Sequence, residues 1–171
     1  MTPKTLFRIL PLLFFLFSCK EEPCETVTCL NGGTCQEIDG SCLCLEGYEG
    51  DFCESLVIQK FLGTYQVSYN GCFVTTPNHT ILVEEIENEP MKVHLYHLGD
   101  YACPGGEVKL TASISGANIA LPSQTVDCGA IAYTFQGEGS FSGTTLTLDF
   151  SVQYESDGFS RTDNCTAIMQ K

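Results

Sequence analysis

Residues 145–154 read TLTLDFSVQY, with Leu, Leu, Phe, Val and Tyr at the even positions and polar residues at the odd ones. Side chains of a β-strand point alternately to the two faces of its sheet. This alternation predicts a strand with one face in an apolar core and the other in water. It is the clearest structural signal in the chain and indicates an all-β fold for the segment around it.

The period of two recurs on both sides of this strand. It is found at Tyr65–Tyr69, Val108–Ile114 and Ile131–Phe135, and shorter strand-like runs occupy residues 79–87, 91–98, 117–122 and 162–170. Turn-forming residues separate these runs, as in Ser156-Asp157-Gly158. About eight sequential strands with short connections favour an antiparallel meander. Such a meander must protect its edges, so we expect a closed β-barrel, with a two-sheet sandwich as the alternative.

A glycine-rich stretch, Gly137-Glu138-Gly139-Ser140-Phe141-Ser142-Gly143, stands between two of the expected strands. It lacks the Gly-x-Ser-x-Gly spacing of a nucleophile elbow, a Lys, and a following helical pattern. We expect a glycine bulge and a hairpin between strands 131–137 and 144–154. No catalytic residue is predicted here or elsewhere.

Six cysteines crowd a short segment near the N-terminus. They are Cys24, Cys29, Cys35, Cys42, Cys44 and Cys53. A segment of this size cannot bury enough apolar surface to fold alone and depends on disulfides, which persist in an oxidising compartment. The chain is therefore predicted to be exported.

The cysteine spacing, with Asn-Gly-Gly-Thr at 31–34 and Gly-Tyr-Glu-Gly at 47–50, resembles the EGF-like module. The resemblance implies three disulfides: Cys24–Cys35, Cys29–Cys42 and Cys44–Cys53. The cysteine count alone leaves many pairings open. The resemblance also implies a protein-contact surface or a rigid spacer. Tyr48 and Phe52 either contact a partner or cover the disulfides.

No metal or cofactor site is predicted. The calcium-binding subclass of the module has Asp or Asn two residues past the third cysteine and an aromatic residue further on, whereas this chain has Glu37 and no Tyr or Phe before Cys42. His94 and His97 are three apart on an expected strand and would point to opposite faces. The remaining histidine, His79, is expected in a turn.

The N-terminus is predicted to be a signal peptide, residues 1–18. Lys4 and Arg8 precede or border an apolar run at 9–17 that is too short to span a bilayer. Leu16-Phe17-Ser18-Cys19 resembles a bacterial lipobox, which implies that Cys19 is lipidated and begins the mature chain. An ordinary signal peptide with a free or externally paired Cys19 is the alternative. The chain has 11 cysteines, and setting Cys19 aside leaves two even sets.

Lys20-Glu21-Glu22 resembles the export signal that Bacteroidota use for lipoproteins at the outer face of the outer membrane. This implies a protein anchored in the outer membrane through Cys19 and facing the exterior, with residues 19–23 as an acidic tether. The net charge of −13 repels nucleic acid and anionic membrane surfaces. Nucleic acid is therefore excluded as a partner.

Phe61-Leu62-Gly63-Thr64-Tyr65 resembles the start of a lipocalin-type barrel, with Tyr65 where that family has Trp. The resemblance implies the barrel architecture, and a ligand does not follow from architecture alone. Four cysteines lie in this part of the chain. First and last strands are neighbours in a closed meander, so Cys72–Cys165 is the preferred pair and Cys103–Cys128 is left, although other pairings stay open.

These observations divide the chain into a signal peptide (1–18), a tether (19–23), an EGF-like module (24–54) and a β-barrel domain (55–171). The predicted function is a non-enzymatic, surface-anchored lipoprotein that binds an extracellular protein, a glycan or a small apolar ligand. The alternative is a structural or assembly subunit of a cell-envelope complex, docked or spaced by the EGF-like module. A carrier of apolar ligands would need a hollow barrel.

Overall fold

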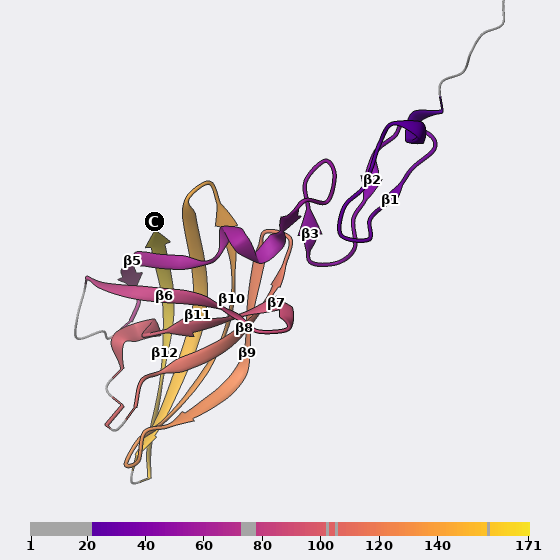
Figure 1. Cartoon of the computed structure of the whole chain (residues 1–171). Helices are drawn as coiled ribbons and strands as arrows, with labels where there is room; N and C mark the ends of the chain where they lie inside the picture. Colours follow the sequence, from indigo (N-terminus) through magenta and orange to yellow (C-terminus); the bar gives the residue numbers. More distant parts are fainter. Residues whose placement is uncertain (1–21, 73–77, 102, 105, 157) are drawn as a thin grey trace, which may run out of the picture.

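The computed structural model describes residues 22–72, 78–101, 103–104, 106–156 and 158–171. The predicted signal peptide and the predicted lipid attachment site, Cys19, lie outside these residues. A small disulfide-rich segment leads into a single β-barrel (Figure 1). Within the described ranges the only helices are three short 3₁₀ turns, and none is long and apolar enough to cross a membrane.

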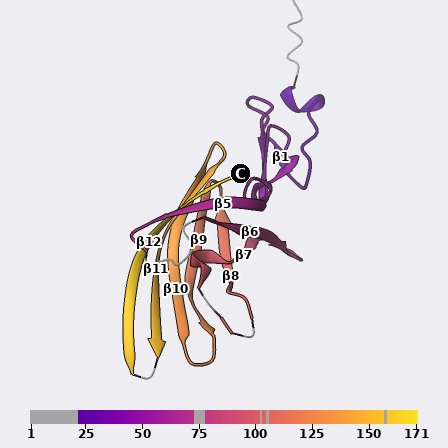
Figure 2. The same cartoon turned by 90° about the vertical axis from the view of Figure 1, so that its left-hand side faces the viewer.

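The barrel is an eight-stranded antiparallel meander (Figures 1 and 2). Its strands are β5 (Gly63–Asn70), β6 (His79–Ile86), β7 (Glu89–Tyr96), β8 (Lys109–Ser115), β9 (Asn118–Asp127), β10 (Ala132–Ser142), β11 (Thr145–Ser156) and β12 (Phe159–Gln170). Each strand pairs with the next, and β12 returns to pair with β5 over Thr166–Gln170. The predicted all-β barrel is confirmed, and the sandwich is excluded.

The glycine-rich stretch differs from the prediction. Strand β10 runs without interruption to Ser142, so Gly137 and Gly139 lie inside a strand, and only Gly143 (φ 62°) forms the hairpin turn. The expected bulge is present, but between β9 and β10, where the pairing register shifts between Phe135 and Gly137. A Cβ atom at Gly139 would overlap the Thr147 carbonyl oxygen of β11. The glycines are therefore needed for close approach of two strands rather than for a loop.

The alternating pattern of β11 is realised as expected, with Leu146, Leu148, Phe150 and Val152 all buried. Their neighbours around the barrel have no exposed surface at all: Tyr65, Ile81, Val93, Leu95, Leu110, Phe135, Ala167 and Met169 are each 0% exposed. A cavity large enough for water would leave accessible area on the side chains that line it. The barrel interior is therefore filled by its own side chains, as in other small barrels.

Both ends of the barrel are covered. At one end lies η2 (Val57–Lys60), a 3₁₀ turn whose Val57 and Ile58 are buried against the core. The Lys171 ammonium group at the C-terminus donates a hydrogen bond to the Lys60 carbonyl oxygen (2.8 Å) and lies over the Tyr65 ring. At the other end, η3 (Leu98–Asp100) places the fully buried Leu98 into the core.

The disulfide-rich segment contains η1 (Pro23–Glu25) and four two-residue strands, β1 (Thr34–Cys35), β2 (Cys42–Leu43), β3 (Tyr48–Glu49) and β4 (Ser55–Leu56). The disulfides here are Cys24–Cys35, Cys29–Cys42 and Cys44–Cys53, and those in the barrel are Cys72–Cys165 and Cys103–Cys128. These are the five pairs that the sequence analysis favours. In the barrel, Cys72–Cys165 joins the connection after β5 to β12. Cys103–Cys128 joins the connection after β7 to the segment that follows β9.

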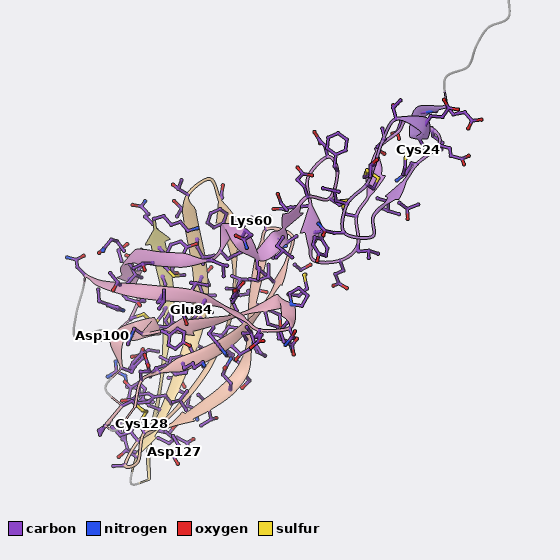
Figure 3. All side chains as sticks on the ribbon, viewed as in Figure 1. Cys24, Lys60, Glu84, Asp100, Asp127 and Cys128 are labelled. Atoms are coloured by element: carbon purple, nitrogen blue, oxygen red, sulfur yellow. A yellow bond between two sulfur atoms is a disulfide. The ribbon has the colours of Figure 1, made fainter. Side chains whose placement is uncertain are left out.

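The two parts of the chain share a junction with no free linker (Figure 3). Strand β4, which leads into the barrel, pairs with β3 of the disulfide-rich segment. The Val57 N–H donates to the Gly47 carbonyl oxygen (2.9 Å), and the Lys60 ammonium group contacts the Glu49 carboxylate at 2.7 Å. Gly47 also lies against the Met91 side chain of β7. The junction therefore fixes how the small segment is held on the barrel.

The close approach at Gly139 leads to a stability prediction. Gly139→Ala places a methyl group against the backbone of β11, where nothing can move aside, and should lower the free energy of unfolding by about 1–3 kcal/mol. Urea denaturation followed by circular dichroism measures the loss. Gly106→Ala is the matched control, because a Cβ atom there meets nothing within 4 Å. Equal effects of the two substitutions would contradict the packing described for β10.

Candidate functional site

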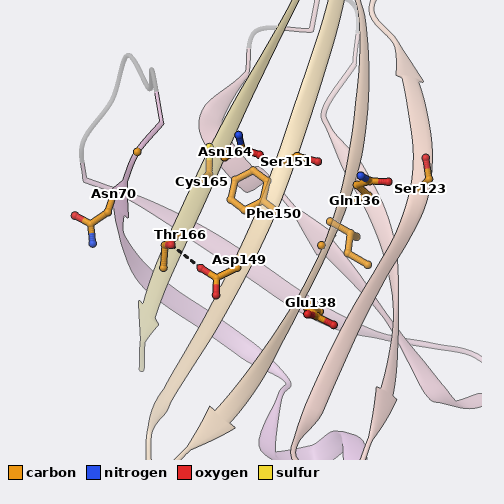
Figure 4. Close-up of a pocket in the computed structure, with 13 residues that line it drawn as sticks. Asn70, Ser123, Gln136, Glu138, Asp149, Phe150, Ser151, Asn164, Cys165 and Thr166 are labelled. Atoms are coloured by element: carbon orange, nitrogen blue, oxygen red, sulfur yellow. Dashed lines mark hydrogen bonds between the residues drawn. The ribbon is translucent and has the colours of Figure 1, made fainter.

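A polar groove runs across the outer wall of the barrel over β9, β10, β11 and β12 and the end of β5 (Figure 4). Its volume is about 780 Å³, most of it open to solvent rather than enclosed. Its polar lining side chains are Asn70, Ser123, Gln136, Glu138, Asp149, Ser151, Asn164 and Thr166. The groove is open to solvent, and it is separated from the apolar interior by the barrel wall.

The local sequence explains why the wall is hollowed here. The bulge between β9 and β10 falls next to Gln136, and the adjacent lining residue Gly137 allows β10 to approach the β11 backbone closely. The buried Leu121 and Phe150 lie beneath, at the base of the groove. Strong bending of long strands at bulges and glycines is the usual way in which a β-sheet acquires a concave surface.

The groove offers hydrogen-bonding groups of both kinds but only one sign of charge. Amide side chains provide donors and acceptors, hydroxyl groups provide both, and Glu138 and Asp149 provide carboxylates. None of the described lining residues is Lys, Arg or His. Glu138 and Asp149 are direct partners across β10 and β11, and Asp149 accepts a hydrogen bond from the Thr166 hydroxyl. Like charges directly opposite one another destabilise a sheet, and a ligand that donates hydrogen bonds or carries positive charge would relieve this.

An aromatic cluster covers the end of the barrel remote from η2. The Tyr101 ring lies 5.1 Å from the Tyr133 ring, which in turn lies 6.2 Å from the Tyr154 ring. Beside them, the buried Asp163 accepts a hydrogen bond from the Arg161 guanidinium group (3.0 Å). The Tyr101 hydroxyl is buried without a hydrogen-bond partner among the described residues. The cluster packs against this end of the barrel core, with Tyr101 also 5.6 Å from the Phe135 ring.

Burial keeps these phenols neutral. It raises the pKa of Tyr65 to about 12 and raises the pKa of Tyr69 and of Tyr101 further above the ordinary value. The pKa of Tyr154 is also raised, by burial first and then by the nearby Asp163 carboxylate. For Tyr65, near η2, and for Tyr69 and Tyr101, near η3, the shifts follow from burial of the ring in the barrel, and no nucleophile is activated by them.

His94 lies on a strand as predicted, whereas His79 and His97 do not lie where they were expected. His79 is the first residue of β6 rather than part of a turn, and its Nε2 is within hydrogen-bond distance of the Tyr69 hydroxyl (3.1 Å) and the His97 carbonyl oxygen (2.9 Å). His97 lies past the end of β7 in a left-handed conformation (φ 66°). His94 is in β7, and its pKa is lowered, mainly by desolvation and less by the positive charge of nearby Lys109. Among the described residues, no three His, Cys, Asp or Glu side chains are grouped to hold a metal ion.

Sequence reasoning missed the groove. Its residues come from five strands, and they meet only because the pairing register places Glu138 opposite Asp149 and Asp149 opposite Thr166. The polar positions of TLTLDFSVQY were expected to face water. The alternating pattern does not indicate whether the surface that they face is flat or concave. Of the two aromatic residues singled out in the small segment, Tyr48 is half-buried in β3, and Phe52 is 49% exposed.

Comparisons with known proteins give short matches only. A stretch of 36 residues, 20% of this chain, is 50% identical to protein crumbs homolog 2 of Mus musculus and spans 3% of that protein. A stretch of 63 residues, 34% of this chain, is 40% identical to coagulation factor XII of Cavia porcellus and spans 10% of it. Together with the three disulfides between residues 24 and 53, these matches fit an EGF-like module.

No protein-family model matches the chain, and no solved structure matches it.

Proposed function

We propose that this protein is a non-enzymatic binding protein displayed on the outer face of a bacterial outer membrane. In this proposal a lipid on Cys19 anchors the chain, the EGF-like module serves as a spacer, and the barrel binds its ligand in the groove of its outer wall. The observation that carries the proposal is the polar groove on a barrel whose interior is full. A full interior leaves the outer surface as the place for recognition.

The geometry supports the spacer role. Cys24 lies at the end of the module remote from the barrel (Figure 3), and the predicted attachment site precedes it by only a few residues. The β3–β4 pairing and the Lys60–Glu49 contact hold the barrel at the other end of the module. A lipid on Cys19 would thus hold the barrel, with its groove, away from the membrane surface.

The chemistry of the groove favours a glycan that is uncharged or carries amino groups. Sugar hydroxyls need both donors and acceptors, which the Gln136 amide and the Glu138 and Asp149 carboxylates supply in a rigid sheet. An acidic ligand would meet two carboxylates with no opposing cation in the described lining. An apolar ligand would desolvate these polar groups without replacing their hydrogen bonds, which is unfavourable.

The same pair of carboxylates does not have the environment of a glycosidase site. Such enzymes need one carboxyl group held protonated, usually in an apolar, water-poor pocket. Glu138 and Asp149 are both exposed in an open groove. Binding without turnover is therefore the function that this site supports.

The anchor is tested by the mass of the N-terminal peptide from protein extracted from its own cells. We expect a peptide that begins at Cys19 and carries the added mass of a diacylglycerol and a further acyl chain. Stable membrane attachment takes more than one acyl chain, and the diacylglycerol alone supplies two. An unmodified N-terminus at another residue would remove the anchor and the surface tether from the proposal.

The groove is tested with three oligosaccharide probes: a neutral glucan, an amine-bearing chitosan oligomer and a sulfated heparin fragment. We expect calorimetry to show binding of the first or second probe and no binding of the third. Gln136→Ala should weaken binding about tenfold or more, because buried polar groups of the ligand lose their partner. Glu138→Gln should have a comparable effect only if the amine-bearing probe is the ligand.

Gln66→Ala is the matched control, since Gln66 is exposed on β5 and does not line the groove. Equal losses with Gln66→Ala and Gln136→Ala would place the binding site elsewhere. Binding of the heparin fragment, or cleavage of any probe, would overturn the proposed function.

A further inference from the structure

Large exposed apolar side chains are concentrated on the EGF-like module. Of the six in the described residues, five belong to this short segment: Leu30, Ile38, Leu43, Leu45 and Phe52, exposed by 46%, 92%, 62%, 56% and 49%. The barrel, which is several times longer, contributes only Phe159. Single exposed apolar residues are common on proteins, but a contiguous group of them marks an interaction surface.

Four of the five belong to neighbouring backbone segments of the module, and we call them the apolar patch: Leu30, Leu43, Leu45 and Phe52. Thr34 pairs with Leu43 in the β1–β2 ribbon, and the same register places Leu45 opposite Gly32. A Cβ atom at Gly32 would meet the Leu45 side chain at 2.9 Å, which confirms that Leu45 lies over this glycine. Leu43 and Leu45 thus share the ribbon face opposite Cys42 and Cys44.

The other two members, Leu30 and Phe52, are joined to each other through their backbones. The Leu30 N–H donates to the Phe52 carbonyl oxygen (2.8 Å), so these two backbones run side by side. The Leu30 carbonyl oxygen accepts a hydrogen bond from the Gly33 N–H (2.9 Å), which closes a turn over residues 30–33. Ile38 lies apart, in the loop that connects β1 to β2.

The surroundings of the apolar patch carry charge of one sign. Residues 24–54 contain seven carboxylates and no Lys, Arg or His. Glu46 follows Leu45 directly, Asp51 precedes Phe52, and the Glu54 carboxylate accepts a hydrogen bond from the Phe52 N–H (2.9 Å). Only Glu49 has a cationic partner in the described residues, and that partner, Lys60, belongs to the barrel side of the junction.

We propose that the apolar patch docks a second protein whose contact surface has an apolar centre flanked by Lys or Arg. The patch supplies the apolar contact, and the carboxylates around it select a basic rim. A second copy of this chain would bring the same carboxylates against one another, and an anionic membrane would be repelled. This inference goes beyond the groove and does not depend on it.

The junction makes the patch a pre-organised surface. Three disulfides fix the module, and the hydrogen bond from Val57 to Gly47 with the β3–β4 pairing fixes the module on the barrel. Little conformational entropy is then lost on docking, which raises affinity for a given contact area. The module would thus be a docking element as well as a spacer.

The test uses two fluorescein-labelled amphipathic peptides with Leu and Trp on one helical face. One carries Lys on the opposite face, and the other carries Glu there. With the folded chain from residue 20 onward, fluorescence anisotropy should show binding of the Lys peptide and at least tenfold weaker binding of the Glu peptide. The affinity for the Lys peptide should fall as salt is raised from low to physiological ionic strength, because exposed charges are screened.

Matched variants separate the patch from the rest of the module. Leu45→Ser combined with Phe52→Ser should weaken binding of the Lys peptide about tenfold or more, whereas Ile38→Ser should leave it unchanged. The double variant Glu46→Lys/Asp51→Lys should bind the Glu peptide more tightly than the Lys peptide. Glu25→Lys changes a carboxylate in η1 and should leave the Lys peptide preferred. Disulfide mapping of each variant, which should show Cys24–Cys35, Cys29–Cys42 and Cys44–Cys53, confirms folding of the module.

Three results would overturn the inference: equal binding of both peptides, equal loss with Ile38→Ser, or binding of neither peptide. A concentration-dependent dimer of the chain in sedimentation that Leu45→Ser abolishes would assign the patch to a second copy instead. Failure of these tests leaves the groove untouched, because Gln136→Ala alters glycan binding and no contact of the module. The two proposals therefore stand or fall separately.

Discussion

The closed barrel with a filled interior is the constraint on which the rest of this structure depends. An amphipathic strand such as TLTLDFSVQY must bury one face, and eight of them in sequence can do so without free edges only by closing on themselves. The buried residues then fill the interior, from the Phe61 end near η2 to the tyrosines at the far end. A barrel packed in this way offers its outer wall, and not its lumen, to a ligand. The polar strand positions, which the sequence predicts only to face water, thereby form the candidate site.

The EGF-like module follows a different physical rule. It is too small to form a core, so disulfides stabilise it, and its remaining apolar side chains have nowhere to be buried. This explains why the module exposes Leu43, Leu45 and Phe52, while Tyr65 or Leu148 in the barrel have no exposed surface. The β3–β4 pairing joins the EGF-like module rigidly to the barrel, because the chain enters the barrel as a paired strand. One protein thus presents a polar groove and an apolar patch in a fixed arrangement.

Local patterns predicted much of this fold, and pairing decided the rest. Alternation gave the strands, and turn residues separated them. The pairing of Cys72 with Cys165 followed from the neighbourhood of first and last strands in a closed meander. The glycine-rich stretch was assigned wrongly in part, since glycine inside a strand and glycine in a loop look alike in sequence. His79 was placed in a turn because of the adjacent Pro77 and Asn78, although its ring bridges Tyr69 and His97. The groove could not be predicted, because Gln136, Asp149 and Asn164 meet only through the register of two strand pairs, β10–β11 and β11–β12.

The central claim, that recognition takes place outside a full barrel, is tested most directly by a crystal of the chain under xenon pressure. Xenon enters dry apolar cavities that water leaves empty. The account predicts no xenon atom among Tyr65, Leu95, Leu110 and Leu148 in the barrel interior. A xenon site there would show a hollow core, and the barrel would then be a carrier of apolar ligands rather than a module that binds through its outer wall.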